Sequence, residues 1–302
     1  MNSDALPHVE SLQRVLSTVS GHRARALLDQ GYAPSGPNGP YHDPETPARN
    51  TAHYLFLMSN QASGANTERY YDAADISFQY LNSDQVRPEK QSIHIRSKQG
   101  KDYCNGVVGQ AWIIEALVAA ADSFDEPRWY RAAEELFLLH PWDPETCVWD
   151  RVEPDGMVLS ADGTFNHQLW FAAAGSTLHK TPLAQERAHE FLTRVAARVQ
   201  TYRKGVVKHS SPMWSVPHGF RHGVKRGLGG LKGRLRNSLP NTTMYKKSVG
   251  YHGFNMYAYA MLKQAFPEHP FWSSNRFNHL LQPVRDDRFE AELDQSIFSW
   301  HY

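Results

Sequence analysis

The sequence predicts an all-α protein of the α/α toroid class, in which fully buried helices alternate with helices that expose one face to solvent. Apolar residues recur at helical spacing through most of the 302 residues, whereas sustained strand-like alternation is scarce. Strongly apolar segments alternate with more polar, amphipathic ones, as inner and outer helices should. Each apolar segment also follows an Asn or His that lies beside an aromatic residue or a glycine. A globular helical bundle is the competing class.

The individual elements follow from this pattern in chain order. An amphipathic first helix ends near Gly31, and the Pro/Gly-rich loop 31–47 follows it. Inner helices are expected over roughly 49–62 and 105–122, from about 166, and over roughly 251–266. Outer helices are expected over roughly 67–82, 128–140 and 182–203, and from about 271. VEPDGMVLSADGTF, residues 152–165, predicts a small hairpin with turns at Asp155 and Asp162.

Composition indicates an ordinary soluble protein that forms one toroid domain over residues 1–302. The hydrophobic and charged fractions are 41% and 21%, and the formal net charge is +1, so no global affinity for nucleic acid is expected. Cys104 and Cys147 are too few for a disulfide framework. No secretory signal or membrane-spanning stretch is predicted, so we expect a cytoplasmic location.

Four short motifs mark the starts of the inner helices. They are RNTAHYL from Arg49, YCNGVVGQ from Tyr103, NHQLW from Asn166 and YHGFN from Tyr251. In a toroid these starts converge on one end of a central cavity. Their polar side chains would then line a pocket, which avoids the cost of burying them without partners.

The four motifs, in this order, resemble the six-hairpin glycosidase-like superfamily, which includes unsaturated uronyl hydrolases and the helical domains of uronyl epimerases and lyases. Their order and the chain length resemble more specifically the VpsJ-type proteins of exopolysaccharide biosynthesis. The resemblance covers roughly residues 40–285. It implies a carbohydrate-active enzyme of cell-surface polysaccharide biosynthesis or modification, one that cleaves a glycosidic bond in an acidic or lipid-linked saccharide.

Glycoside hydrolysis needs two carboxyl groups, one to protonate the leaving group and one to activate water or attack carbon. Asp102 and Asp150 are the preferred candidates, because each precedes an inner helix. Glu153, Asp155 and Asp162 lie in the same stretch as Asp150, but Asp before Gly is more typical of turns.

A uronyl lyase or epimerase is the alternative enzyme, and it needs an acid and a base on the sugar face plus a cation for the carboxylate. His167, Tyr251 and His252 are catalytic candidates for this chemistry, and Arg49 could supply the cation. The other expected sugar-binding residues of the motifs are Asn50, His53, Tyr103, Asn105, Asn166, Gln168, Trp170 and Asn255. No metal or cofactor site is expected, since the sequence lacks HExxH, P-loop and GxGxxG motifs.

Residues 215–241 contain no acidic residue and are expected to form a flexible basic insertion. Arg221, Lys225 and Arg226 within it are expected to bind an acidic glycan, a lipid-linked sugar or an anionic membrane surface. This insertion also keeps open a third class, a non-catalytic glycan-binding or scaffold protein that associates with the membrane.

Overall fold

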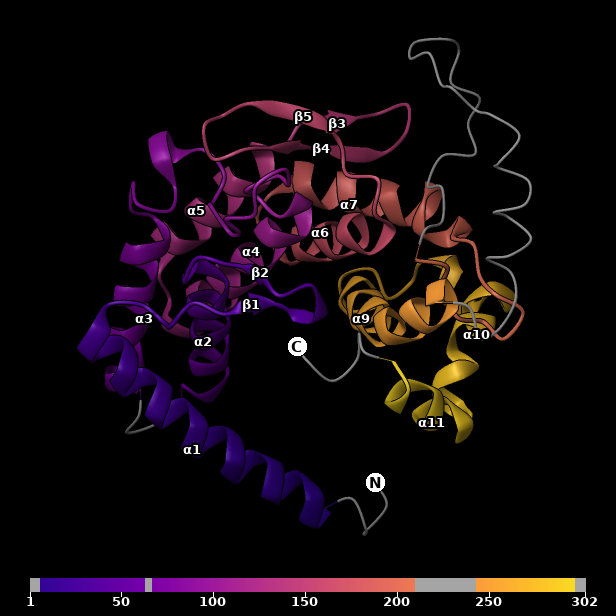
Figure 1. Ribbon diagram of the computed structural model, residues 1–302, viewed down its shortest axis with the longest axis horizontal. Helices are drawn as coiled ribbons and strands as arrows, with labels where there is room; N and C mark the ends of the chain where they lie inside the picture. Colours follow the sequence, from indigo (N-terminus) through magenta and orange to yellow (C-terminus); the bar gives the residue numbers. More distant parts are fainter. Residues whose placement is uncertain (1–5, 63–66, 210–242, 297–302) are drawn as a thin grey trace. The chain divides into compact units, whose positions relative to one another are not determined.

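The computed structural model describes residues 6–62, 67–209 and 243–296, which fold into two compact units (Figure 1). Unit 1 comprises residues 1–38, 43–140 and 151–159, and unit 2 comprises residues 39–42, 141–150 and 160–302. The basic insertion at 215–241 lies outside the described residues.

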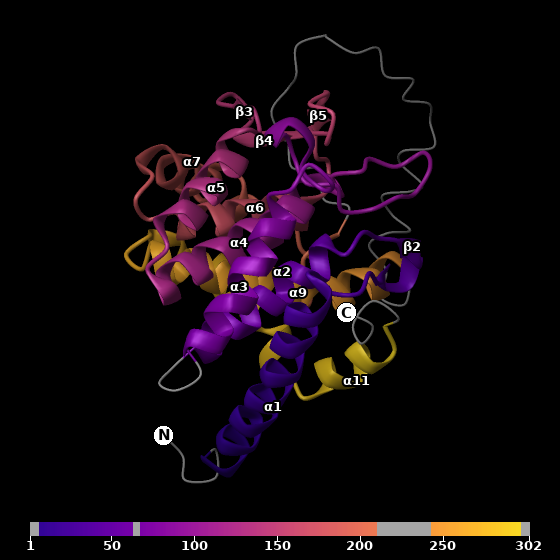
Figure 2. The same ribbon diagram turned by 90° about the vertical axis from the view of Figure 1, so that its left-hand side faces the viewer.

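Unit 1 is built from five helices among its described residues: α1 (Leu6–Gln30), α2 (Ala48–Gln61), α3 (Thr67–Leu81), α4 (Gly106–Phe124) and α5 (Pro127–Leu138). Helix α4 packs against α2 and α5, and α1 packs against α2 and α3 (Figure 2). Two short strands, β1 (Pro37–Asn38) and β2 (Asp43–Pro44), pair antiparallel ahead of α2. Gly31 ends α1 as predicted, with the positive φ of 84° that a helix C-terminus favours.

Helix α4 has the burial expected of an inner helix. Within the part of the chain that the structure describes, it alone is long and apolar enough to cross a bilayer, yet most of it is buried inside the protein. Val107, Ile113 and Ile114 are each completely buried. Its apolar character is therefore accounted for by packing within unit 1.

Unit 2 contains α6 (Phe165–Thr177), α7 (Pro182–Arg194), α9 (Thr243–Ala265), α10 (Asn275–Leu281) and α11 (Arg288–Asp294). Helix α6 packs against both α7 and α9. The expected end of α7 near residue 203 is wrong, because the helix ends at Arg194 and the short 3₁₀ turn Ala196–Arg198 follows. Helix α9 begins at Thr243, before the expected 251, because Tyr245, Ser248 and Val249 extend its buried face by two turns.

The strands β3 (Trp142–Asp143), β4 (Val148–Val152) and β5 (Val158–Ala161) form a small sheet in that order. Its β4–β5 hairpin was predicted, and the Gly156 N–H closes the turn by donating to the Glu153 carbonyl at 2.9 Å. The second predicted turn, at Asp162, is found as an Asx turn, in which the Asp162 side chain accepts the Thr164 N–H at 3.0 Å just before α6.

Near the start of each of two inner helices, a buried glutamine side chain forms hydrogen bonds to the backbone of an earlier residue. Gln110 of α4 accepts the Ile93 N–H at 2.8 Å and donates to the Ile93 carbonyl at 3.0 Å. Gln168 of α6 does the same with Trp149, accepting its N–H at 3.0 Å and donating to its carbonyl at 2.7 Å. Both glutamines are fully buried. The polar side chain at the start of an apolar helix is thus satisfied by backbone groups.

We expect Gln168→Leu to lower the free energy of unfolding by about 2–4 kcal/mol, because it leaves the buried N–H of Trp149 without its partner and leaves the Trp149 carbonyl with only the longer contact from the Asp162 N–H at 3.4 Å. Urea unfolding followed by circular dichroism measures the loss. The exposed Gln79 of α3 provides the control, and Gln79→Leu should change stability by less than about 0.5 kcal/mol. Equal effects of the two substitutions would show that the Gln168 hydrogen bonds add no stability.

Candidate functional site

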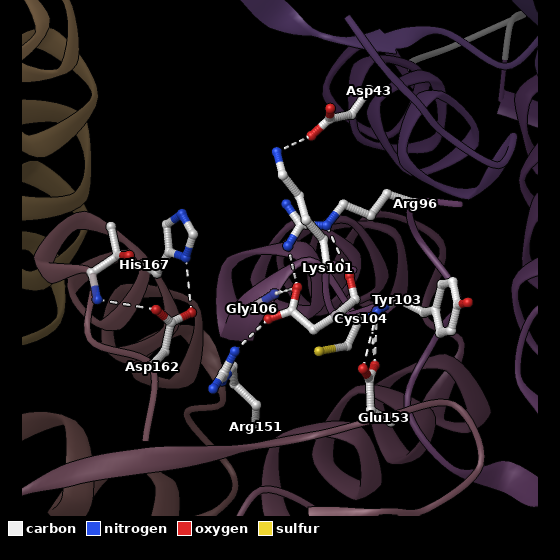
Figure 3. A network of polar contacts seen from close by, with 12 residues as sticks. Asp43, Arg96, Lys101, Tyr103, Cys104, Gly106, Arg151, Glu153, Asp162 and His167 are labelled. Atoms are coloured by element: carbon white, nitrogen blue, oxygen red, sulfur yellow. Dashed lines mark hydrogen bonds and ion pairs between the residues drawn. The ribbon is translucent and has the colours of Figure 1, made fainter. Parts of the chain in front are cut away.

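Asp102 is held between two guanidinium groups in the loop before α4 (Figure 3). Its Oδ2 atom lies 2.6 Å from Arg151 Nη1, and its Oδ1 atom pairs with Arg96 and accepts the Gly106 N–H at 3.3 Å. Only 6% of the side chain is exposed. Both oxygens are thus occupied by partners within unit 1, so the geometry favours a structural role for this predicted catalytic residue.

The YCNGVVGQ motif is braced in a similar way by Glu153. Its carboxylate accepts the backbone N–H groups of Tyr103 and Cys104 at 2.9 and 3.0 Å (Figure 3). Asn105 then adopts a left-handed φ of 57° and is buried, whereas 45% of Tyr103 is exposed. A side chain at Gly109 would place Cβ 2.3 Å from the Cys104 carbonyl oxygen, so this position requires glycine. Of the predicted sugar contacts in this motif, Tyr103 alone offers a solvent-accessible side chain.

Arg49 forms the centre of a cluster at the start of α2. Its Nη2 atom lies 2.9 Å from Glu45 Oε2 and donates to the Pro37 carbonyl at 3.1 Å. The guanidinium carbon also stands 5.6 Å from the centroid of the Trp112 ring, within cation–π range. The Glu45 side chain is only 1% exposed, and burial raises its pKa to about 7 despite the opposing charges of Arg49 and Arg96.

His53 and Asn50 belong to the same turn of α2. The His53 ring lies 5.8 Å from the Trp112 ring, and Asn50 Nδ2 donates to the Pro34 carbonyl at 2.7 Å. The His53 side chain is exposed, and desolvation by the nearby protein groups and the charge of Arg49 lower its pKa to about 4. His53 is therefore a neutral imidazole at physiological pH.

A His–carboxylate pair lies at the start of α6 in unit 2. His167 Nδ1 is 2.8 Å from Asp162 Oδ2, and 25% of the His167 side chain is exposed (Figure 3). With Asp162 accepting the Nδ1 proton, Nε2 is left as the basic nitrogen of the ring. The sequence analysis treated Asp162 as a turn residue and so missed this partner.

His209 and Tyr251 stack beside this pair, with ring centroids 4.5 Å apart and an interplanar angle of 22°. Burial, followed by the charges of Lys247 and His167, lowers the pKa of His209 to about 3. Its Nδ1 atom is buried and has no hydrogen-bond partner among the described residues. Lys247 Nζ lies 5.8 Å from the Tyr251 ring centroid. His209 and Lys247 were not predicted, because neither belongs to a helix-start motif.

Aromatic and amide side chains of α6 and α9 accompany these groups. Trp170 lies 5.4 Å from Tyr257 and 6.0 Å from Phe254 between ring centroids. Asn166 and Asn255 are buried, and the Oδ1 atom of each lacks a hydrogen-bond partner in the described part of the chain. Both oxygens are enclosed by protein, so a sugar could not reach them in this conformation.

Other predicted site residues have different surroundings. His252 is fully buried, and its two ring nitrogens contact the Val207 N–H at 3.3 Å and the Leu280 carbonyl at 3.1 Å, so it serves as a core residue. Gln168 is committed to the backbone hydrogen bonds described above. Asp150 is half-buried on β4. Arg221, Lys225 and Arg226 lie outside the described residues.

The structure thus gathers candidate residues into two clusters, each within one unit. The unit 1 cluster consists of Glu45, Arg49, His53 and Trp112. The unit 2 cluster consists of Asp162, His167, His209, Lys247 and Tyr251. Among the described residues, no group of three or more His, Cys, Asp or Glu side chains is placed to hold a metal ion.

Sequence comparison identifies a curated relative over nearly the whole chain. Archaeal glycosylation protein Q from Haloferax volcanii is 35% identical over 302 residues, which cover 97% of this chain and 81% of the relative. The chain belongs to the family of archaeal glycosylation protein Q. No family model matches the sequence. The comparison does not confirm the narrower resemblance to VpsJ-type proteins.

Comparison with solved structures confirms the all-α toroid class. Cellobiose 2-epimerase from Bacillus thermoamylovorans superposes with a TM-score of 0.54 at 11% identity, covering 88% of this chain and 66% of that enzyme. Cellobiose 2-epimerase from Spirochaeta thermophila gives a TM-score of 0.52 at 14% identity, covering 94% of this chain and 72% of that enzyme. The chain therefore spans about two thirds of the length of the first of these structures.

Proposed function

We propose that the protein is a sugar epimerase or isomerase that serves glycosylation. The observation that carries this proposal is the Asp162–His167 pair with the stacked His209 and Tyr251 beside it. The name of the curated relative supports the link to glycosylation, and the two fold neighbours are epimerases of a disaccharide. Of the two enzyme classes that the sequence analysis left open, this is the one that uses His and Tyr.

Epimerisation next to a carbonyl requires a base that removes the carbon-bound proton and an acid that returns it on the other face. His167 Nε2 is the proposed base, since Asp162 fixes its tautomer and stabilises the imidazolium that forms. Tyr251, stacked on His209, is the proposed acid that returns a proton from the other face; His167 then releases its proton to water and Tyr251 regains one from water. His209 is neutral at physiological pH, because its pKa is lowered to about 3, so it can orient groups by hydrogen bonding but is not the acid. Lys247, whose Nζ lies 5.8 Å from the Tyr251 ring centroid, is the proposed source of positive charge for the oxygen on which negative charge develops.

Glycosidic bond cleavage, the leading expectation from sequence, gains no support from Asp102, Asp162 or Glu45. Asp102 is paired with Arg96 and Arg151, and Asp162 is paired with His167. Glu45 has the raised pKa of a general acid, but its side chain is 1% exposed and cannot reach a substrate. Hydrolysis requires two carboxyl groups that contact the bond, so we favour proton transfer at carbon.

Hydrogen exchange at carbon tests the proposal. We expect the purified protein in D₂O to replace the proton on the carbon next to the carbonyl in a reducing sugar, with the epimer or isomer appearing in the NMR spectrum. Cellobiose, simple aldohexoses and hexuronates form the starting panel. Cleaved products without exchange would indicate a hydrolase, and a new carbon–carbon double bond would indicate a lyase. Sugar binding without any turnover would indicate a glycan-binding protein.

A further inference from the structure

The charge of Arg49 is already balanced inside unit 1. Glu45 Oε2 lies 2.9 Å from its Nη2 atom, and the two side chains are 1% and 12% exposed. Neither Glu45 oxygen accepts a hydrogen bond from the described residues, so this ion pair is its closest stabilising contact. The Nη2 atom also donates to the Pro37 carbonyl, and this leaves Nη1 as the guanidinium nitrogen available to a ligand.

The other charges that face Glu45 are themselves paired. Arg96 acts on Glu45 from the neighbouring segment and is bound to Asp102, while Asp43 is held by Lys98 and Lys101. On the α2 side, His53 is neutral at physiological pH because its pKa is lowered to about 4. The neighbouring cations Arg96, Lys98 and Lys101 are each bound to a carboxylate other than Glu45, which leaves Glu45 as the carboxylate in direct contact with Arg49 among the described residues.

We propose that Glu45 is a specificity-determining residue, which makes Arg49 recognise a neutral oxygen of a sugar and reject a carboxylate or phosphate. The inference rests on the proposed function in taking the ligand to be a sugar. An anionic group bound to Arg49 would lie within a few ångströms of the Glu45 carboxylate, and this repulsion is strong where water is scarce. A hydroxyl or carbonyl oxygen accepts the same N–H group without that cost. The sequence analysis had expected Arg49 to bind the carboxylate of a uronic acid.

The isosteric substitution Glu45→Gln tests this by removing the charge alone. At pH 8, D-glucuronate should bind the wild-type protein at least about tenfold more weakly than D-glucose. In E45Q the dissociation constant of glucuronate divided by that of glucose should be lower by about tenfold or more. Glucose affinity should change by less than about threefold. Binding is followed by the NMR signal of the His53 ring, which lies one helical turn from Arg49. Sodium sulfate serves as a second anion, whose binding to Arg49 does not depend on a sugar site. Sulfate should shift this signal in E45Q and leave it unchanged in the wild type.

Matched variants and pH separate the proposal from its alternatives. The double variant Glu45→Gln/Arg49→Met should lose the sulfate response, whereas the exposed substitution Asp84→Asn should behave as wild type. Lowering the pH from 8 to 6 should strengthen sulfate binding to the wild type, because it protonates Glu45, whose pKa is about 7. A folded E45Q that does not bind sulfate would overturn the proposal. If E45Q does not fold, unchanged sulfate binding by the wild type between pH 8 and 6 overturns it. Absence of sugar turnover affects only the proposed function.

Discussion

His167→Asn is expected to lower kcat/KM for the proposed epimerisation by about 10²–10⁴-fold, because it removes the proposed base. Asparagine keeps a polar group of similar reach, so sugar binding should change little. The substitution should therefore act mainly on kcat. Deuterium incorporation from D₂O measures the proton-transfer step directly, and imidazole added to the variant should restore part of the rate.

Asp162→Asn tests the Asp162–His167 pair by removing the charge of the carboxylate. The asparagine cannot stabilise the imidazolium of His167, so kcat should fall while KM changes by less than about threefold. The exposed His179 of unit 2 is the control, and His179→Asn should leave the rate within about twofold of wild type. Normal proton exchange by a folded His167→Asn variant would rule out His167 as the base.

The elements that the sequence predicted best are the ones whose signal is local. The inner helices α2, α4 and α6 begin within one or two residues of their expected starts, since runs of apolar residues at helical spacing define them. The end of α7 and the start of α9 were misplaced. Each depends on which residues a neighbouring segment buries, as Tyr245 and Val249 of α9 illustrate.

The site was predicted only in part, because its chemistry depends on residues that are distant in the sequence or that have the sequence context of a turn. His167 was recognisable from its motif, whereas its partner Asp162 has the sequence context of a turn, with glycine following. His209 precedes the basic insertion without a periodic pattern, and its contact with Tyr251 joins residues 42 positions apart. Glu45 was not predicted, because it precedes α2 and is positioned by a β-bridge to Arg96 that the sequence does not signal.

Asp102→Asn is expected to lower the free energy of unfolding by about 2–4 kcal/mol. The substitution keeps the shape of the side chain but leaves Arg96 and Arg151, whose side chains are 13% and 25% exposed, without their counter-charge. Urea unfolding measures the loss, and the exposed Asp84→Asn should cost less than about 0.5 kcal/mol. A buried charge without its partner costs more stability than the removal of both charges. The double variant Asp102→Asn/Arg151→Met should therefore lose less free energy of unfolding than the sum of the losses in Asp102→Asn and Arg151→Met.

The same variant distinguishes the two enzyme classes that the sequence left open. A hydrolase that used Asp102 as its acid or nucleophile would lose at least about 10²-fold in kcat on conversion to asparagine. A structural Asp102 predicts that the folded variant keeps kcat within about threefold of wild type below its unfolding transition. Measuring the free energy of unfolding and kcat on one preparation of Asp102→Asn therefore distinguishes a structural role of Asp102 from a catalytic one. Loss of turnover at unchanged stability would return Asp102 to the catalytic site and favour glycosidic cleavage.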